Sequence, residues 1–188
     1  MILNGTEDLR VKKTVTGIKR AFKSLLEERD AEEISVKELC EEADVNKKTF
    51  YHYYKSVNEL LAEIQMEYAL DFLKNLREYV VPEELGALNR DFFLYADKQD
   101  NAFDRVLTAY PQIDFQPIIN VLKERLGWSR SPEYQKLTNY EQNFLLDFTV
   151  YSVLNSCRRW IKDGKSMPLK RVIAMTNKLI EGGVQRFF

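Results

Sequence analysis

The segment from Ser35 to Lys55 holds a group of side chains that can bond to the bases and phosphates of DNA. Lysine donates to guanine O6 and N7 and to phosphate oxygens, and threonine methyl groups and tyrosine rings contact the methyl group of thymine. A helix that begins near Lys47 and turns Phe50 toward the core would expose five such side chains. These are Lys47, Lys48, Thr49, Tyr51 and His52. Their types and spacing predict a helix that enters the major groove.

Two capping signals predict the elements that position this helix. Ser35 and Glu38 have the spacing of a capping box, and apolar residues recur from Val36 at helical intervals, so a short helix should begin there. Asp44 tolerates the left-handed conformation that a tight turn requires, and Asn46 is a good N-cap for the second helix. Two short helices joined by a three-residue turn form a helix-turn-helix.

Charge is distributed unevenly along the chain. The formal net charge is only -1, which by itself does not indicate a nucleic-acid partner. The stretches from Arg10 to Lys23 and from Val45 to Lys55, however, contain basic residues and no acid. Because salt screens charges over roughly 8 Å under physiological conditions, such local basic faces can bind phosphate despite acids elsewhere. A solvated helix surface of mixed sign is the alternative for any single cluster.

The composition predicts an all-α protein and excludes several functional classes. The chain has 188 residues, 45% of them hydrophobic, with seven Gly and five Pro, and it lacks alternating β-branched runs. No catalytic set, phosphate-binding glycine loop or metal-ligand spacing is present, so we expect no enzyme and no cofactor. Without a signal-peptide pattern or an apolar run of about 20 residues, a cytoplasmic location is expected.

Periodicity and capping signals predict further helices after the helix-turn-helix. These cover residues 57–80, 83–98, 101–110, 116–126, 139–163 and 168–181, with a loop over 127–138. The helix over 57–80 should end before Val81-Pro82, because proline disfavours helical geometry in the residue before it. The helix over 139–163 carries apolar residues on more than one face, which predicts two packing partners.

The stretch VKELCEEADVNKKTFYHYYKSVNELL, residues 36–61, resembles the helix-turn-helix of the tetracycline-repressor (TetR) family of bacterial transcription regulators. The likeness lies in Thr49-Phe50-Tyr51, the aromatic pair Tyr53-Tyr54 followed by Lys55, and the Glu-Leu-Leu of the next helix. The chain departs where the family commonly has Ala, Gly and a second Lys, at Cys40, Asp44 and Val57. Val57 removes one possible phosphate contact.

The resemblance implies a helix-turn-helix DNA-binding domain over residues 1–55 and a helical ligand-binding and dimerisation domain over residues 56–188. It places Lys47, Lys48, Thr49, Tyr51 and His52 in the groove, with Tyr53 and Lys55 on phosphate. Ser35 would present the N-terminus of its helix to the DNA backbone.

The resemblance also implies a function. We expect a repressor that a small-molecule effector releases from a palindromic operator in double-stranded DNA, and a homodimer formed by the last two helices. The pocket candidates are Phe92, Phe93, Phe103, Tyr110, Tyr151, Asn155 and Arg158. Aromatic residues at helical spacing are more often core residues, and an inward-facing Arg158 would point to an anionic ligand.

Two alternatives remain open on the sequence. A helical protein-interaction adaptor of the same fold, without specific DNA binding, is compatible with the near-neutral charge and with Val57. A thiol-based sensor would require Cys40 or Cys157 to be exposed and acidic.

Overall fold

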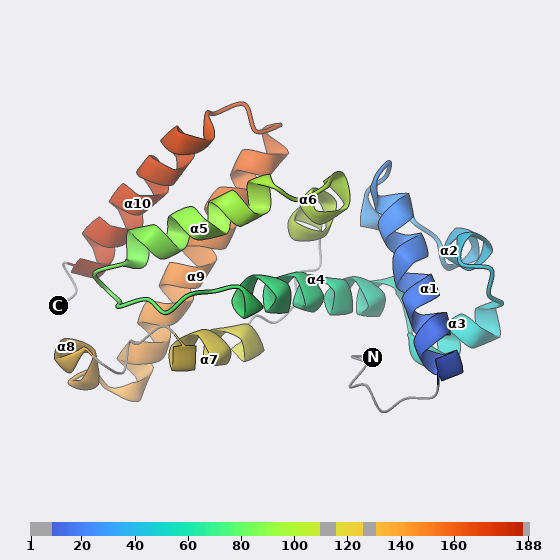
Figure 1. Ribbon diagram of the computed structural model, residues 1–188, viewed down its shortest axis with the longest axis horizontal. Helices are drawn as coiled ribbons and strands as arrows, with labels where there is room; N and C mark the ends of the chain where they lie inside the picture. The colour runs from blue at the N-terminus through green and yellow to red at the C-terminus, as the bar shows by residue number, and fades with distance from the viewer. Residues whose placement is uncertain (1–8, 110–115, 126–130, 186–188) are drawn as a thin grey trace. The chain divides into compact units, whose positions relative to one another are not determined.

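The computed structural model describes residues 9–109, 116–125 and 131–185, and these ranges contain helices and no strand (Figure 1). The expected all-α class is therefore confirmed. The chain packs as two compact units. The first unit consists of residues 1–69 and 99–113, and the second consists of residues 70–98 and 114–188.

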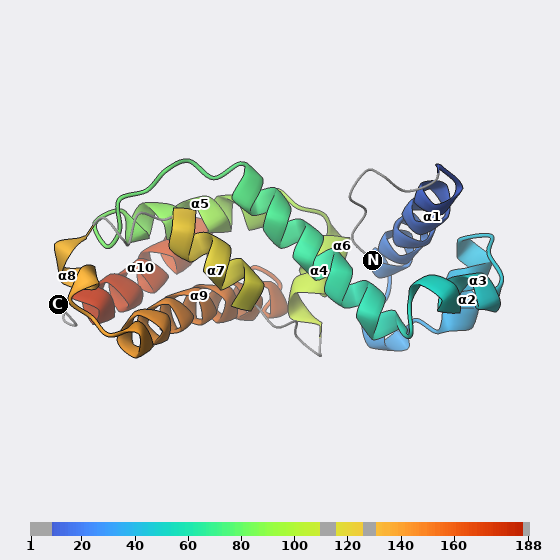
Figure 2. The ribbon, with the colours of Figure 1, turned by 90° about the horizontal axis from the view of Figure 1, so that it is seen from below.

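The first unit is built around α1 (Leu9–Leu26), which packs against α2 (Val36–Glu42) and α6 (Asn101–Thr108). A short 3-10 helix (Ala31–Glu33) connects α1 to α2, and α3 (Lys47–Tyr53) and the first part of α4 (Val57–Lys74) complete the unit (Figures 1 and 2). A buried apolar cluster joins all these α-helices; its largest members include Phe22, Phe50 and Tyr54.

The first unit extends past the expected domain boundary at residue 55. Ala102, Val106 and Ala109, from α6 and the residue that follows it, belong to the same buried cluster as Phe22. The Gln65 side chain of α4 donates to the Val106 carbonyl at 2.9 Å. The division of function between residues 1–55 and 56–188 stays a prediction.

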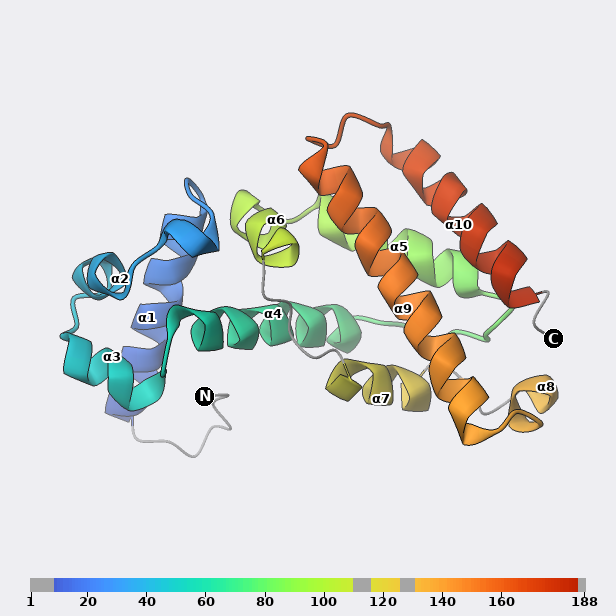
Figure 3. The ribbon, with the colours of Figure 1, turned by 180° about the vertical axis from the view of Figure 1, so that it is seen from behind.

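The second unit consists of α5 (Leu85–Asp97), α7 (Gln116–Arg125), α8 (Pro132–Gln135), α9 (Asn139–Lys162), α10 (Leu169–Gln185) and the end of α4. α10 packs against both α5 and α9, and α7 packs against α9 (Figure 3). The Asn89 amide donates to Asn177 Oδ1, and Asn177 donates to the Gly86 carbonyl at 3.2 Å. A Cβ on Gly86 would overlap Glu181 Oε1 and lie 2.9 Å from Asn177 Nδ2, so a larger residue would displace these two side chains of α10.

The largest differences from the predicted helices concern α4, α10 and the predicted loop. α4 ends at Lys74 instead of near residue 80, and the Asn75 side chain donates to the Asp71 carbonyl at 3.0 Å in competition with the helical backbone. α10 continues through Gly182-Gly183 because Ile180 and Val184 are buried one turn apart, and packing outweighs low helix propensity. The loop predicted over 127–138 contains α8, which Ser131 caps.

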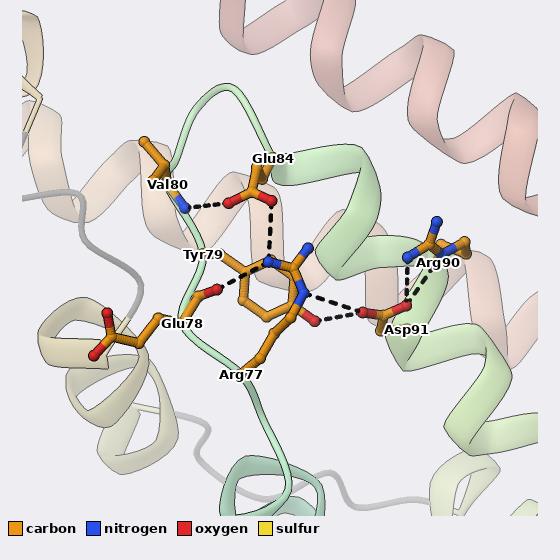
Figure 4. A network of polar contacts seen from close by, with 7 residues as sticks. All are labelled: Arg77, Glu78, Tyr79, Val80, Glu84, Arg90 and Asp91. Atoms are coloured by element: carbon orange, nitrogen blue, oxygen red, sulfur yellow. Dashed lines mark hydrogen bonds and ion pairs between the residues drawn. The ribbon is translucent and has the colours of Figure 1, made fainter.

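A polar network holds the connection between α4 and α5 (Figure 4). Arg77 donates to the Glu78 carbonyl at 2.9 Å and to Glu84 Oε1 at 3.0 Å. The other Glu84 oxygen accepts from the Val80 N–H at 2.8 Å, and Tyr79 donates to Asp91 at 2.6 Å. Two of these bonds satisfy backbone groups, the Val80 N–H and the Glu78 carbonyl, that a longer α4 would have paired within the helix.

Local interactions define both ends of α9. Thr138 and Glu141 cap α9 reciprocally, and Gly164 ends it with a φ of 64°. Within the part of the chain that the structure describes, no helix combines the length and the apolar character that a membrane crossing requires.

The capping box of α2 includes an additional ion pair. Ser35 accepts from the Glu38 N–H at 3.2 Å and donates to Glu38 Oε2 at 2.7 Å. Glu38 Oε1 also accepts from Arg29 at 2.8 Å. The bond from Arg29, followed by those from Ser35, lowers the pKa of Glu38 to about 2.

We expect Glu38→Gln to lower the thermal midpoint at pH 7 and to lose this effect in acid. A carboxylate whose folded pKa lies below its ordinary value stabilises the protein above that ordinary value. The contribution is lost as the pH falls from about 4.5 toward about 2. Thermal melts between pH 7 and pH 2.5, with the exposed Glu42→Gln as control, test this. A difference between Glu38→Gln and the parent that stays constant over this range would contradict it.

Candidate DNA-binding site

The turn between α2 and α3 has the geometry that its sequence predicts. Asp44 adopts a φ of 53°, in the left-handed region. The Val45 N–H then donates to the Cys40 carbonyl at 3.0 Å, which ends α2. Asn46 caps α3 by accepting from the Thr49 N–H at 2.8 Å. The turn thus sets the direction of α3 through backbone conformation and one side-chain cap.

Core contacts set the rotation of α3 about its axis. Phe50 is fully buried and Tyr54, just after the helix, is 1% exposed. Their rings lie 5.8 Å apart in the apolar cluster of the first unit. With Phe50 inward, the opposite side of α3 must face solvent.

The exposed residues of α3 include most of the predicted DNA contacts. Lys47, Lys48, Tyr51 and His52 are exposed, and we call their side chains the reader face. The Tyr51 ring packs edge-on against Phe50 at 5.5 Å, which limits the freedom of its position. Lysine, tyrosine and histidine side chains in this arrangement can donate to base edges and phosphate oxygens.

Thr49 and Tyr53 are less accessible than the reader face. Thr49 is partly buried, and its hydroxyl donates to Asn46 Oδ1 at 3.1 Å. Tyr53 is partly buried and stands edge-on to His52 at 4.9 Å. Both still line a surface depression shared with Asn46, Lys48, Tyr51 and His52. The sequence predicted only a capping role for Asn46, whereas the structure also places it in this depression beside Lys48, Tyr51 and His52.

Ser35 and Lys55 flank the reader face in sequence. The Ser35 hydroxyl is already bonded to Glu38, and a phosphate at this end of α2 would meet the Glu38 carboxylate. Lys55 is exposed, while its N–H donates to Glu59 Oε2 at 2.6 Å. The Ser56 hydroxyl accepts from the Glu59 N–H at 3.3 Å and so caps α4, while the Glu59 carboxylate accepts from the Lys55 N–H. Geometry favours Lys55 over Ser35 as a phosphate contact.

The pocket candidates do not form one group. Phe92 and Phe93 lie next to each other on α5, and Phe93 is fully buried beside Trp160 at 6.0 Å. Phe103 belongs to the first unit, where it stands edge-on to Tyr68 at 5.0 Å. Tyr110 lies outside the described residues.

The polar pocket candidates lie together on α9. Tyr151 is partly buried, Asn155 is exposed and Arg158 is only 5% exposed. Arg158 donates to Asn155 Oδ1 at 3.2 Å. Burial is the main cause that lowers the pKa of Arg158. The inward orientation that the sequence left undecided is thus found in the second unit.

The cysteines lack the features of a thiol sensor. Cys40 and Cys157 are both buried, and burial raises the pKa of Cys40. A reactive cysteine requires an accessible thiolate, so neither residue meets that requirement. Among the described residues, no group of three or more His, Cys, Asp or Glu side chains could hold a metal ion.

Comparison with protein families shows that the segment containing this site is similar to a known family. Residues 19–64 match the family described as bacterial regulatory proteins, tetR family. No curated protein matches the chain in sequence.

Among solved structures, the fatty acid degradation regulator FadR from Bacillus halodurans aligns with a TM-score of 0.62 at 15% identity, over 90% of this chain and 95% of that chain. FadR from Bacillus subtilis, solved with stearoyl-CoA, gives 0.54 at 15% identity, over 88% and 95%. A tetR-family regulator from Streptomyces coelicolor gives 0.53 at 14% identity, over 90% and 78%. At these identities the likeness concerns the fold. Residues 19–64 are therefore similar to the tetR family of bacterial regulatory proteins, within a chain whose fold resembles that of these solved structures.

Proposed function

We propose that this protein is a homodimeric repressor that binds a palindromic operator and is released from it by a small-molecule effector. The observation that carries the proposal is the reader face: four exposed groups, Lys47, Lys48, Tyr51 and His52, on a helix whose opposite side is anchored in the core. No acid interrupts the chain from Val45 to Lys55, so this surface attracts phosphate. Tyr53 and Lys55 extend the proposed contacts to the DNA backbone.

An exposed apolar surface supports the homodimer. On α9, Tyr140, Phe144 and Phe148 are 78%, 55% and 45% exposed at intervals of four residues, which places them on one side of the helix. On α10, Met175 and Leu179 are 47% and 70% exposed. A Cβ on Gly183 of α10 would lie 3.6 Å from the Phe148 ring, so the two exposed sets are continuous. Such apolar surface is typical of an interface, and a second copy would cover it.

A homodimer would also carry two copies of the reader face, and recognition of a DNA sequence generally requires two. One seven-residue helix contacts few base pairs, whereas two related by a two-fold axis read half-sites about 34 to 36 Å apart. An effector could bind more tightly when the two α3 helices have one spacing than when they have another. It would then change the affinity for DNA by at most the ratio of its own affinities for these two states.

The buried arginine supports an anionic effector. Arg158 carries a charge into the second unit, and an anionic group beside it would recover the electrostatic energy that burial costs. The similar regulator from B. subtilis was solved with stearoyl-CoA, which combines anionic groups with an acyl chain. We propose acyl-CoA thioesters as the effector class.

We expect Lys47→Ala and Tyr51→Ala each to weaken operator binding by about 1 to 3 kcal/mol. Lys47→Ala should also reduce the slope of log affinity against log salt by about 1 if the ammonium neutralises a phosphate. Fluorescence anisotropy on duplexes selected from a randomised pool measures both quantities, with the exposed Lys136→Ala of the second unit as control. Affinity that neither substitution changes would favour the adaptor function instead.

We expect Phe144→Glu and Leu179→Glu to produce monomers, because each places a charge in an apolar interface. Sedimentation velocity should show the parent protein at about twice the chain mass of 22.2 kDa and the variants near that mass. Leu9→Glu is the matched control, since Leu9 is 82% exposed on α1 of the first unit. A parent protein that sediments as a monomer would refute the homodimer.

We expect stearoyl-CoA to raise the thermal midpoint of the parent protein and to lose most of this effect with Arg158→Gln. Ligand at 100 times its dissociation constant stabilises a protein by about 2.7 kcal/mol. Arg159→Gln is the control, because Arg159 is exposed and pairs with Asp163 at 2.9 Å. An equal shift in both variants would exclude Arg158 as the anion-binding group, and no shift in the parent protein would exclude this ligand.

A further inference from the structure

Asn46 lies in the surface depression that contains most of the reader face. Its side chain is exposed, and it shares the depression with Lys48 and Tyr51. Asn46 directly precedes α3, and the first residues of the second helix of a helix-turn-helix contact base edges in the major groove. The amide of Asn46 is therefore placed to meet a base as well as to cap a helix.

Two hydrogen bonds fix which end of this amide remains for a ligand. Asn46 Oδ1 accepts from the Thr49 N–H at 2.8 Å and from the Thr49 hydroxyl at 3.1 Å. A backbone N–H can only donate, so the atom that meets it is the oxygen, and the amide cannot be reversed without loss of the cap. An amide oxygen has two lone pairs, and Thr49 occupies both. Asn46 thus offers a ligand its Nδ2 group, which carries two N–H donors.

A side chain that can only donate recognises a different base from an ordinary asparagine. Asparagine with both ends of its amide free pairs with adenine, because its oxygen accepts from N6 and its nitrogen donates to N7. Guanine instead presents N7 and O6, two neighbouring acceptors, to the major groove. Thymine presents one acceptor there, and cytosine presents a donor. Guanine is therefore the best partner for the Nδ2 group of Asn46.

The side chains that follow Asn46 favour the same base. Lys47 and Lys48 are exposed, and an ammonium group only donates. No acid lies between Val45 and Lys55, so this stretch offers no carboxylate to the amino group of adenine or cytosine. An acceptor-rich base edge is thus attracted to this part of the surface.

We propose that Asn46 is a specificity-determining residue that selects guanine at one position of each operator half-site. The proposal rests on the DNA-binding function proposed above. Recognition of adenine by Asn46 requires Oδ1, and its release would leave the Thr49 N–H at the start of α3 without its acceptor. The cap that stabilises α3 therefore also disfavours adenine.

Selection and base-analogue substitution test the contact directly. Duplexes are selected from a randomised pool by the parent protein and by Asn46→Ser, in which serine keeps the cap and lacks the amide donor. We expect one half-site position to be enriched in guanine for the parent protein and unselective for Asn46→Ser, with the other positions unchanged. At that position 7-deazaguanine, which lacks the N7 acceptor, should weaken binding of the parent protein by at least about fivefold and of Asn46→Ser by less than about twofold. Fluorescence anisotropy measures both ratios.

Two further variants separate the donor from the cap. Asn46→Asp keeps an N-cap oxygen of equal quality and replaces the amide nitrogen by a carboxylate oxygen. We expect it to keep the thermal midpoint of the parent protein and to weaken duplex binding at least about tenfold, because a carboxylate repels guanine acceptors and phosphates. Asn101→Ser makes the same change as Asn46→Ser at an exposed position of α6 and should behave as the parent protein.

The outcomes separate this proposal from the regulator function. A parent protein without a guanine preference, a preference that survives in Asn46→Ser, or an adenine at the position that Asn46 controls would overturn the proposal and leave DNA binding standing. A uniform loss of affinity with unchanged base preference would also overturn it, because Asn46 would then bind a phosphate. Failure of the parent protein to select any duplex would refute the regulator function and, with it, the role of Asn46.

Discussion

The burial of Phe50 and Tyr54 in the apolar cluster of the first unit is the interaction on which the reader depends. α3 has only seven residues, and isolated helices of that length are not stable in water. Its helical state and its rotation therefore come from packing against α1, α2 and α4. The same anchoring turns the polar side chains outward, so presentation of the reader face follows from core formation.

Positively charged side chains occur in two environments, on the exposed surface of α3 and in the buried interior. On α3, Lys47 and Lys48 are exposed to water, and reversible, salt-dependent binding of a phosphate requires such cations. Lys19 and Arg158 are buried, where desolvation opposes a charge. For Lys19, bonds to Glu63 and Glu67 more than offset this desolvation, so its pKa is raised. For Arg158 burial prevails and lowers the pKa.

Segments that are distant in sequence complete the first unit. α6 returns to the first unit after α5, and Arg105 of α6 pairs with Asp30 and donates to the Glu28 carbonyl at 3.1 Å. α4 carries bonds to α1 and α5 on adjacent turns. The first unit is thus completed by segments that lie outside the helix-turn-helix in sequence. The family match ends at residue 64, so it includes only part of this unit.

The sequence by itself determined the features that arise from contacts within a few residues. The caps at Ser35, Asn46 and Thr138, the left-handed Asp44 and the helical stop at Gly164 each follow from bonds or backbone preferences over at most four positions. Periodicity then predicted the helices, the inward Phe50 and the exposed reader face.

Only the tertiary structure decided which helices meet and what each buried polar group contacts. Lys19 and Glu63 are 44 residues apart, and Gln65 and Val106 are 41 apart. No local pattern indicates that Lys19 is buried, that Phe103 packs in the first unit or that Arg158 faces inward. The end of α4 at Lys74 likewise depends on Glu84, which bonds to Val80 and Arg77 from the start of the next helix. Periodicity specifies that a helix has an inner face, but the partner of that face is set by packing across the whole chain.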